Sequence, residues 1–314
     1  MKQIFKNQFL LAIIAYLFIV GVITAFVFGF LQKIKLANLA EQEKLSIYQN
    51  LKIKDQQFEQ SFQKVTCDGN LFFQAGASVT AIYISQKHLY LSQVDNKLTV
   101  INLDAPEKIV SFALPVLTDI YSDGTDIYGT DFFNDKVVRL IFEKGEVVAG
   151  KYYPKIGRAS ALARDARGYF YVSGYASGNT TKIIGRDGFL FLSGLDKIVD
   201  LEASGSSYLL AARYGSKPTL ISIDLNGNKQ TILEQNKSIS SLFLDNDIFW
   251  VAYNQAGQSQ IGKVIGEKLV NIQVLDCPFP LKIAASPDKL FYTSLSDSEG
   301  KVYWINKNLQ SSGI

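Results

Sequence analysis

Side chains with catalytic or metal-binding chemistry are scarce in this chain. Its 314 residues include two cysteines, one methionine and a single histidine, His88. A zinc site built on several histidines is therefore excluded, and a serine or cysteine triad would depend on His88, which has no nucleophile motif beside it. We expect His88 to be a surface or packing residue of a strand, and we predict neither a catalytic residue nor a cofactor.

Concentrated charge of one sign is also lacking. The 32 Lys and Arg residues and the 29 Asp and Glu residues are interspersed, and the net charge is only +3. Nucleic-acid binding requires a dense cationic face that neutralises phosphates, so we predict no nucleic-acid partner. Hydrophobic residues make up 47% of the chain, which is enough to build a sizeable core.

One long hydrophobic run lies near the N-terminus, from Phe9 to Leu31. It contains 23 residues without a charge, and as a helix it would span the hydrocarbon core of a bilayer, which is roughly 30 Å thick. A cleaved signal peptide would have a shorter apolar region followed by a small-residue cleavage motif, which does not occur here. We therefore predict a short tail at 1–8 and an uncleaved transmembrane helix at 9–31.

The orientation of this helix is weakly encoded. Lys2 and Lys6 precede the run, whereas Lys33, Lys35 and Lys44 follow it. Long domains are translocated largely regardless of their charge. We therefore expect a single-pass protein with its N-terminus in the cytoplasm and its large C-terminal domain outside.

The segment 32–65 has neither glycine nor proline and is rich in Gln, Glu, Lys and Leu, all of which favour helices. We predict a helical stalk, for which two interpretations stay open. The stalk either packs as a single helix against its own domain or forms a short coiled coil. Oligomers could form through such a coiled coil or through the membrane helix.

An aromatic-rich, strand-like tetrad returns at a regular interval through the rest of the chain. The first three copies read HLYL, DIYG and YFYV, and successive copies are spaced by 38, 43, 39, 40 and 42 residues. Such a period indicates one closed or stacked repeat architecture rather than several unrelated domains. The third residues of the six tetrads are Tyr90, Tyr128, Tyr171, Leu210, Trp250 and Tyr292.

Each repeat holds about four short strands separated by turn residues. A four-stranded antiparallel unit of about forty residues is typical of a β-propeller blade. The last repeat lacks its fourth strand, whereas an additional strand, Asn70 to Ala75, precedes the first repeat. We therefore predict an all-β, six-bladed β-propeller at 66–314, in which this N-terminal strand completes the last blade and covers its open edge.

The third repeat resembles an NHL-type repeat. In that family an inner strand leads through an acidic-x-x-Gly turn into an aromatic strand, and the stretch from Ala161 to Gly178 follows this pattern. The second repeat matches it in part. The resemblance implies an NHL-like member of the broad group of six-bladed propellers, which includes membrane-tethered sensor domains, lactonases and lyases, and so it implies no single activity. The matching residues are Asp165, Gly168, Tyr171 and Val172, with Asp123, Gly124 and Tyr128 in the second repeat.

Alignment of the inner strands places one polar residue at the same register in every repeat. We expect these six residues to ring the mouth of the central channel, where two carboxylates and one ammonium could bind a cation, a file of water or a polar ligand. They could equally be polar only because they meet water in the channel. Asp119 and Asp200 are weak metal candidates, too few to assert a site. The six residues are Thr80, Asp119, Ser160, Asp200, Ser241 and Lys282.

A second candidate site is formed by aromatic residues in the loops at one face of the ring. Exposed aromatic side chains offer large contact areas at low entropic cost, so we expect a protein or carbohydrate partner there. Alternatively, some of these residues fold back and cap the blades. The residues are Phe132, Phe133, Tyr175, Tyr214, Tyr253 and Phe279.

The two cysteines, Cys67 and Cys277, suit a disulfide in an oxidising compartment. The expected strand register argues against it. Cys67 falls at the start of the closing outer strand and Cys277 after the end of the neighbouring outer strand, which puts them roughly 20 Å apart from strand rise alone. A disulfide requires Cα atoms within about 7 Å, so we expect no bond.

Together these features favour a membrane-anchored extracytoplasmic propeller that acts as a binding or scaffold module. Two alternatives stay open. One is a membrane-tethered hydrolase or lactonase with a metal in the channel, and the other is a structural subunit of a larger cell-envelope complex.

Overall fold

The structure is a computed structural model, and all of the residues it describes belong to the second of two compact units, Met1–Ser61 and Phe62–Ile314. The predicted tail, membrane helix and stalk lie outside the described residues. Within the described part of the chain, no helix has the length and hydropathy needed to cross a membrane. The described residues are 66–122, 126–143, 146–153, 158–175, 181–184, 190–195, 197–204, 208–214, 219–224, 226–234, 238–245, 248–265 and 268–307.

The described residues form six four-stranded sheets, of which the first three follow one another along the chain. The first sheet contains β2 (Val79–Ser85), β3 (His88–Gln93), β4 (Lys97–Asn102) and β5 (Ala105–Ala113). The second contains β6 (Asp119–Ser122), β7 (Ile127–Asp131), β8 (Lys136–Glu143) and β9 (Glu146–Tyr153). The third contains β10 (Ala159–Arg164), β11 (Phe170–Tyr175), β12 (Thr181–Ile184) and β13 (Leu190–Leu195).

The remaining three sheets continue the series, and the last of them recruits a strand from the start of the domain. The fourth contains β14 (Lys197–Ser204), β15 (Tyr208–Tyr214), β16 (Thr219–Asp224) and β17 (Lys229–Glu234). The fifth contains β18 (Ser238–Asp245), β19 (Ile248–Gln255), β20 (Gln258–Ile265) and β21 (Lys268–Leu275). The last contains β22 (Leu281–Ala285), β23 (Lys289–Ser294), β24 (Lys301–Asn306) and β1 (Asn70–Gln74).

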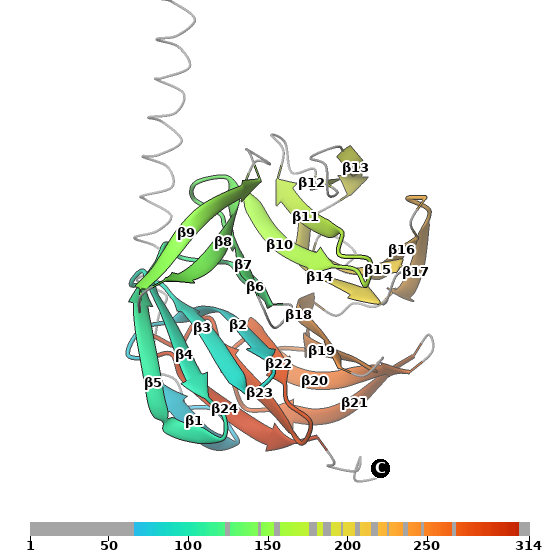
Figure 1. Cartoon of the computed structure of the whole chain (residues 1–314). Coiled ribbons are helices and arrows are strands. Elements are labelled where there is room, and N and C mark those ends of the chain that lie inside the picture. Colours follow the sequence, from blue (N-terminus) through green and yellow to red (C-terminus); the bar gives the residue numbers. More distant parts are fainter. Residues whose placement is uncertain are drawn as a thin grey trace, which may run out of the picture. The chain divides into compact units, whose positions relative to one another are not determined.

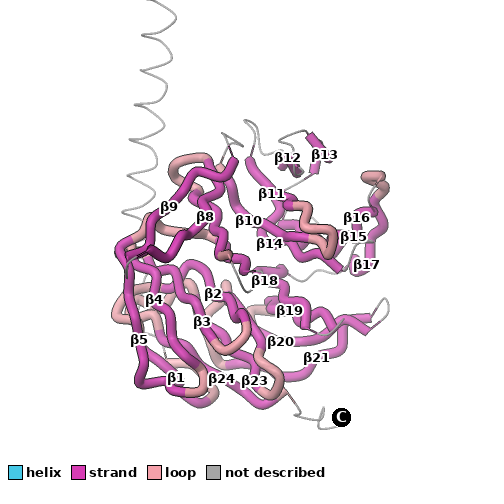
Figure 2. The backbone as a smooth tube through the Cα atoms, in the orientation of Figure 1, coloured by secondary structure: helices cyan, strands magenta, loops and turns pink. Residues whose placement is uncertain are grey.

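The first strand of every sheet lies at the centre of a ring (Figure 1). In chain order, β2, β6, β10, β14, β18 and β22 each contact the next inner strand, and β22 contacts β2 again. Within each sheet the strands pair antiparallel, and in the first sheet short loops join β2, β3, β4 and β5 in turn (Figure 2). A circle of small antiparallel sheets is the β-propeller architecture, and the predicted all-β propeller is confirmed.

The N-terminal strand closes the ring, as predicted. β1 pairs antiparallel with β24, with Asn70 opposite Trp304 and Gln74 opposite Lys301. It becomes the outer strand of a sheet whose other three strands come from the opposite end of the domain. The pairing occupies the edge of β24, which would otherwise stay open.

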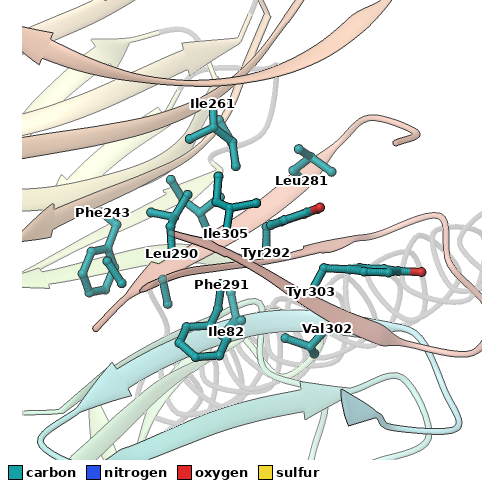
Figure 3. Packing of buried hydrophobic residues seen from close by; sticks show 14 of the residues in the cluster. Ile82, Phe243, Ile261, Leu281, Leu290, Phe291, Tyr292, Val302, Tyr303 and Ile305 are labelled. Atoms are coloured by element: carbon teal, nitrogen blue, oxygen red, sulfur yellow. The ribbon is translucent and has the colours of Figure 1, made fainter. Parts of the chain in front are cut away.

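The hydrophobic core is divided among the interfaces between neighbouring sheets, because each strand presents alternate side chains to its two sides. The largest cluster joins the last sheet to the first and the fifth. Leu290, Phe291 and Tyr292 lie at its centre and are almost completely buried. Figure 3 shows these side chains between the sheets, with Ile82 from β2 and Phe243 from β18.

The acidic-x-x-Gly turn of the third repeat has a defined geometry. The carboxylate of Asp165 accepts the main-chain N–H groups of Arg167 (3.0 Å) and Tyr169 (2.9 Å), and Gly168 has a φ of +82°. A positive φ favours glycine, which explains the residue spacing. Two further turns with the same spacing lie at Asp224 and Asp297, in the fourth and last sheets, outside the two repeats that resemble the NHL type in sequence.

The expectation that the cysteines stay unpaired is wrong. Cys67 and Cys277 form a disulfide with a Cα–Cα distance of 4.5 Å. Our estimate assumed that the residues before β1 continue the line of the strand. Instead, Gly69 has a φ of +115°, and the Asp68 N–H donates to the Asp276 carbonyl (3.3 Å), so the chain turns toward the segment that follows β21. A Cβ at Gly69 would lie 2.5 Å from the Tyr292 hydroxyl, so a larger residue would not fit this turn.

Candidate functional site

A small cavity lies on the axis of the ring, lined by the inner strands of all six sheets. Its volume is about 10 Å³, which is close to the smallest space that holds one water molecule. Half of its fourteen lining residues are apolar. The polar and titratable residues that line it are Tyr83, Asp119, Tyr121, Asp200, Glu202, Ser241 and Lys282.

Asp119 joins the second sheet to the third. It begins β6, and its carboxylate accepts the N–H of the adjacent Ile120 (2.9 Å) through Oδ1. Its Oδ2 accepts the N–H of Leu162 in β10 (2.8 Å). The side chain therefore accepts a hydrogen bond from a main-chain N–H group of the neighbouring sheet. No strand pairing joins the described strands of the two sheets at this place.

Asp200 makes the equivalent connection between the fourth sheet and the fifth. Oδ1 accepts the N–H of Leu201 (2.9 Å), whereas Oδ2 accepts both the Leu242 N–H (2.8 Å) and the Ser241 hydroxyl (2.9 Å). The ammonium of Lys282 lies 3.8 Å from the same Oδ2. Asp200 is buried, and this set of donors compensates for the loss of water around its charge.

Ser241 extends the connection to the last sheet. Its hydroxyl donates to Asp200 and accepts the N–H of Ile283 in β22 (3.3 Å). One serine thus links the fourth, fifth and last sheets. The polar residues at this register act as bridges between inner strands, with the cavity between them.

Thr80 and Ser160 do not belong to this layer. Each is the extra residue of a bulge in its inner strand, where the register with the second strand shifts. The Thr80 hydroxyl donates to the Leu117 carbonyl of the next sheet (2.7 Å), and the Ser160 hydroxyl donates to the Ile198 carbonyl (3.4 Å). Neither residue lines the cavity. The six residues of the predicted ring are therefore divided between a bulge layer and a cavity layer.

Three polar residues of the cavity were missed from the sequence, Tyr83, Tyr121 and Glu202. Glu202 lies two positions after Asp200 on β14, and Tyr83 lies on β2, where its ring packs 5.7 Å from that of Tyr121 and 6.1 Å from that of Phe243. The signal that could have found Glu202 is strand periodicity, because residues two apart on a strand face the same side.

The cavity gathers three carboxyl groups and a single ammonium among the described residues, so it contains an excess of acid. Burial raises the pKa of Asp119 to about 8, with a further contribution from the negative charge of Asp200. The Lys282 ammonium and the two N–H donors act in the opposite direction. Burial, together with Asp200 and Asp119, also raises the pKa of Glu202 well above its ordinary value. Asp119 therefore tends to hold a proton near neutral pH, and burial favours the neutral form of Glu202.

Within the described ranges, no three His, Cys, Asp or Glu side chains come together in a way that could hold a metal ion. The carboxylate oxygens of Asp119 and Asp200 are directed to main-chain N–H groups rather than to a common point. Their chemistry in this arrangement is hydrogen bonding between sheets and proton binding.

At the rim of the ring, Phe132 and Phe133 lie in the loop between β7 and β8. Phe133 is 57% exposed, and its ring meets that of Phe132 edge to face at 5.7 Å. The Arg158 guanidinium lies 5.8 Å from the Phe132 ring, and the Arg158 N–H donates to the Asp135 carboxylate (2.6 Å). These contacts join the loop to the third sheet.

A buried carboxylate fixes the base of the same loop. Asp131 is inaccessible to solvent, and its oxygens accept the main-chain N–H and the side-chain amide of Asn134 (3.1 and 2.8–3.0 Å). The Lys136 ammonium lies 3.7 Å away. Phe133, the exposed member of the aromatic pair, is therefore held on a loop with several fixed points.

The other predicted rim residues differ in their surroundings. Tyr253 is completely buried and contributes to the core between the fourth and fifth sheets, so it offers no contact surface. Phe279 is partly buried and precedes Pro280 in the link between β21 and β22. Tyr175 and Tyr214 end β11 and β15, and their side chains lie outside what the structure describes.

Comparison with known proteins gives structural likeness without a sequence family. No protein-family model matches the chain, and no curated protein matches it in sequence. Among solved structures, virginiamycin B lyase from Staphylococcus aureus is similar with a TM-score of 0.51 at 17% identity, over 79% of this chain and 90% of the lyase.

Two further solved structures are similar at comparable levels. A chain of a nidogen/laminin complex has a TM-score of 0.56 at 13% identity, over 69% of this chain and 96% of that one. The PQQ-bound aldose sugar dehydrogenase from Streptomyces coelicolor has a TM-score of 0.55 at 12% identity, over 76% and 98%. These proteins include two enzymes and a component of a protein complex, so the likeness establishes the β-propeller fold and no activity.

Proposed function

We propose that this chain is a six-bladed β-propeller binding or scaffold module that is anchored in a membrane and engages a protein or carbohydrate partner outside the cytoplasm. In this proposal the ring is the rigid support, the rim aromatic loop at 131–136 is the contact site, and the helix at 9–31 is the anchor. The proposal extends to six blades because six four-stranded sheets occur in the described residues.

The observation that supports a contact site most directly is the exposed Phe133 on a fixed loop. An exposed aromatic side chain on a loop offers a large contact area at low entropic cost, and binding residues are frequent on loops that a rigid scaffold positions. Preorganisation of the loop by Asp131, Asn134 and Arg158 lowers the entropy lost when a partner binds. An aromatic ring beside a guanidinium and amides is suited both to the face of a sugar ring and to a protein surface.

The support for an anchor comes from the sequence alone. Phe9–Leu31 has the length and composition of a membrane span, and no charged residue interrupts it. The large size of the domain that follows favours an extracytoplasmic location for the propeller.

Site-specific photo-crosslinking in the cells that produce the protein tests the contact site. A photoreactive phenylalanine analogue replaces Phe133 in the full chain, and the matched control carries the analogue at Ile248, which is also exposed (39%) and begins β19. We expect an adduct of defined mass from position 133 and none from position 248. Equal labelling from both positions would contradict the proposed site.

A glycan array probed with the full chain in detergent distinguishes the two partner classes. Binding that is lost in Phe133→Ala and retained in Ile248→Ala would identify a carbohydrate, whereas a protein adduct without glycan binding would identify a protein. The absence of both would refute a binding role for this loop. Fractionation of the same cells, with protease added to intact cells, tests whether the propeller lies outside.

A further inference from the structure

The disulfide occupies a particular place in the path of the chain. Cys67 precedes β1, so along the chain the disulfide lies between residues 1–66 and β1. Cys277 lies in the link between β21 and β22, which connects the fifth sheet to the last. Any force that arrives along residues 1–65 therefore meets the disulfide before it meets the closing strand.

Without the bond, the same force would act first on β1, the strand that follows Cys67. β1 is a short strand paired with β24 alone, and Asn70 at its beginning lies opposite Trp304, near the end of β24. A pull on residue 69 would open the antiparallel pair from that end, one residue pair at a time. Leu71 is 55% exposed, and the main aromatic contact of the strand is Phe72 against Phe291, at 5.0 Å between ring centroids.

The attachment at Cys67 is, in contrast, built into the core. Both cysteines are only 6% exposed and belong to the cluster that joins the last sheet to its neighbours. The Cys67 N–H donates to the Tyr303 hydroxyl (3.2 Å). The segments on either side exchange two further hydrogen bonds, from Asp68 N–H to the Asp276 carbonyl (3.3 Å) and from Asp276 N–H to the Asp68 carboxylate (3.2 Å).

We propose that the Cys67–Cys277 disulfide is a mechanical latch, which directs tension from the N-terminal segment into the link between β21 and β22 and leaves the β1–β24 seam unloaded. The inference rests on the proposed membrane tether for the source of the tension. The latch itself is a property of the propeller that can be measured whether or not a partner binds at the rim, so the two proposals fail independently.

Single-molecule stretching of the full chain in detergent tests the latch, with one handle at the N-terminus and the other at the exposed Ile248 of the fifth sheet, so that no handle pulls on β24 itself. The oxidised chain is compared with the double variant C67S/C277S, and residues 1–65 are the same in both, so their contribution to the extension cancels. We expect an early low-force event that releases β1 in the double variant and the loss of this event in the oxidised chain. The same early event in both chains would overturn the latch.

A substitution in β1 provides the matched control. Phe72→Ala weakens the packing of the closing strand without altering either cysteine. We expect it to lower the force of the early event in the C67S/C277S background and to leave the first rupture of the oxidised chain unchanged. Equal lowering in both backgrounds would mean that β1 bears the load despite the bond. If the double variant fails to fold, reduction of the folded wild-type chain provides the same comparison.

Discussion

At the axis of the ring, neighbouring sheets are joined by side-chain oxygens that accept main-chain N–H groups, as Asp119 does for Leu162 and Asp200 for Leu242. At the seam, β1 and β24 are joined by strand pairing, and a disulfide fixes the segment before β1. At the axis the same kind of side-chain bridge occurs between sheets that follow one another in sequence. The seam must join the two ends of the domain, which are far apart in sequence, and there the chain adds a covalent bond.

The comparison teaches which contacts a repeat can supply by itself. Each bridge between consecutive sheets uses a side chain at the same position of the repeat, so a single substitution at that position can create a bridge. Closure of the ring is not repeated in this way. β1 pairs with one strand only, and a single turn at Gly69 leads into β1. We therefore expect changes at the seam to have larger effects than changes at the axis.

Loss of the disulfide should have the largest effect. The bond closes a loop of 210 residues, and the chain-entropy model assigns about 5 kcal/mol of stability to a loop of that size. We expect C67S/C277S to lower the free energy of unfolding by about this amount in a urea titration. Addition of a reductant during the titration should abolish the difference between the two chains. A double variant as stable as the oxidised wild type would show that pairing of β1 suffices for closure.

Asp200→Ala should have the next largest effect. Its carboxylate serves three donors, and Lys282 would remain buried without its counter-charge. The loss of one member of such a buried pair costs about 3–5 kcal/mol. Thermal unfolding measures the change, and Asp200→Asn, which keeps acceptor capacity, should cost less. Equal losses in the two variants would indicate that the charge rather than the hydrogen bonding matters.

The raised pKa of Asp119 should make the free energy of unfolding depend on pH. The pKa of Asp119 is raised to about 8 in the folded chain, whereas its ordinary value is near 4. Between these two pH values the folded state therefore keeps a proton that the unfolded state has lost. The contribution is favourable at low pH and is lost as the pH rises through this window. We expect stability to fall toward pH 8 and Asp119→Asn to reduce this fall by up to about 4 kcal/mol between pH 5 and pH 8.

Urea titrations at a series of pH values measure this effect. Asp224→Asn is the control, because the hydrogen bonds from the Asn228 side chain and from main-chain N–H groups lower the pKa of Asp224. The control should leave the slope between pH 5 and pH 8 unchanged. An unchanged slope in Asp119→Asn would show that Asp119 is ionised throughout.

The bulge layer should give the smallest effect. Thr80→Val removes a hydroxyl that donates to the Leu117 carbonyl of the next sheet, and a hydrogen bond of this kind contributes about 1 kcal/mol. Val199 is the bulge residue of the fourth sheet and has no hydroxyl. We expect Thr80→Val to lower the melting temperature slightly, whereas Val199→Ile, which preserves a β-branched apolar side chain, should change it less. A reversed order would contradict the assigned role of the bulge hydroxyls.

The repeated strands and the closing strand could be predicted because they depend on local patterns. The tetrads and their spacing mark the second strand of each sheet, and the missing fourth strand of the last repeat left one place for Asn70–Gln74. The acidic-x-x-Gly turn likewise needs only a short stretch of chain, with a carboxylate and a glycine of positive φ.

The cavity was only partly predictable because inner strands contain bulges. A single inserted residue shifts every later side chain to the other side of the strand. Thr80 and Ser160 are themselves inserted residues, and Ala81 and Ala161 after them occupy the register of Asp200 and Ser241, so the polar residues of these two strands lie one layer away from the cavity. The disulfide was missed for a similar reason, because the direction of a chain after a glycine of positive φ cannot be read from the residue spacing.

The position of Cys277 also bears on how the molecule is made. Both cysteines precede β22, β23 and β24 in the chain, so they emerge from the ribosome before the last three strands are synthesised. Oxidation at that stage would set β1 beside the place that β24 later fills. β22, β23 and β24 would then complete the ring by pairing with β1, which is already in place, and no search for the distant start of the domain would be needed.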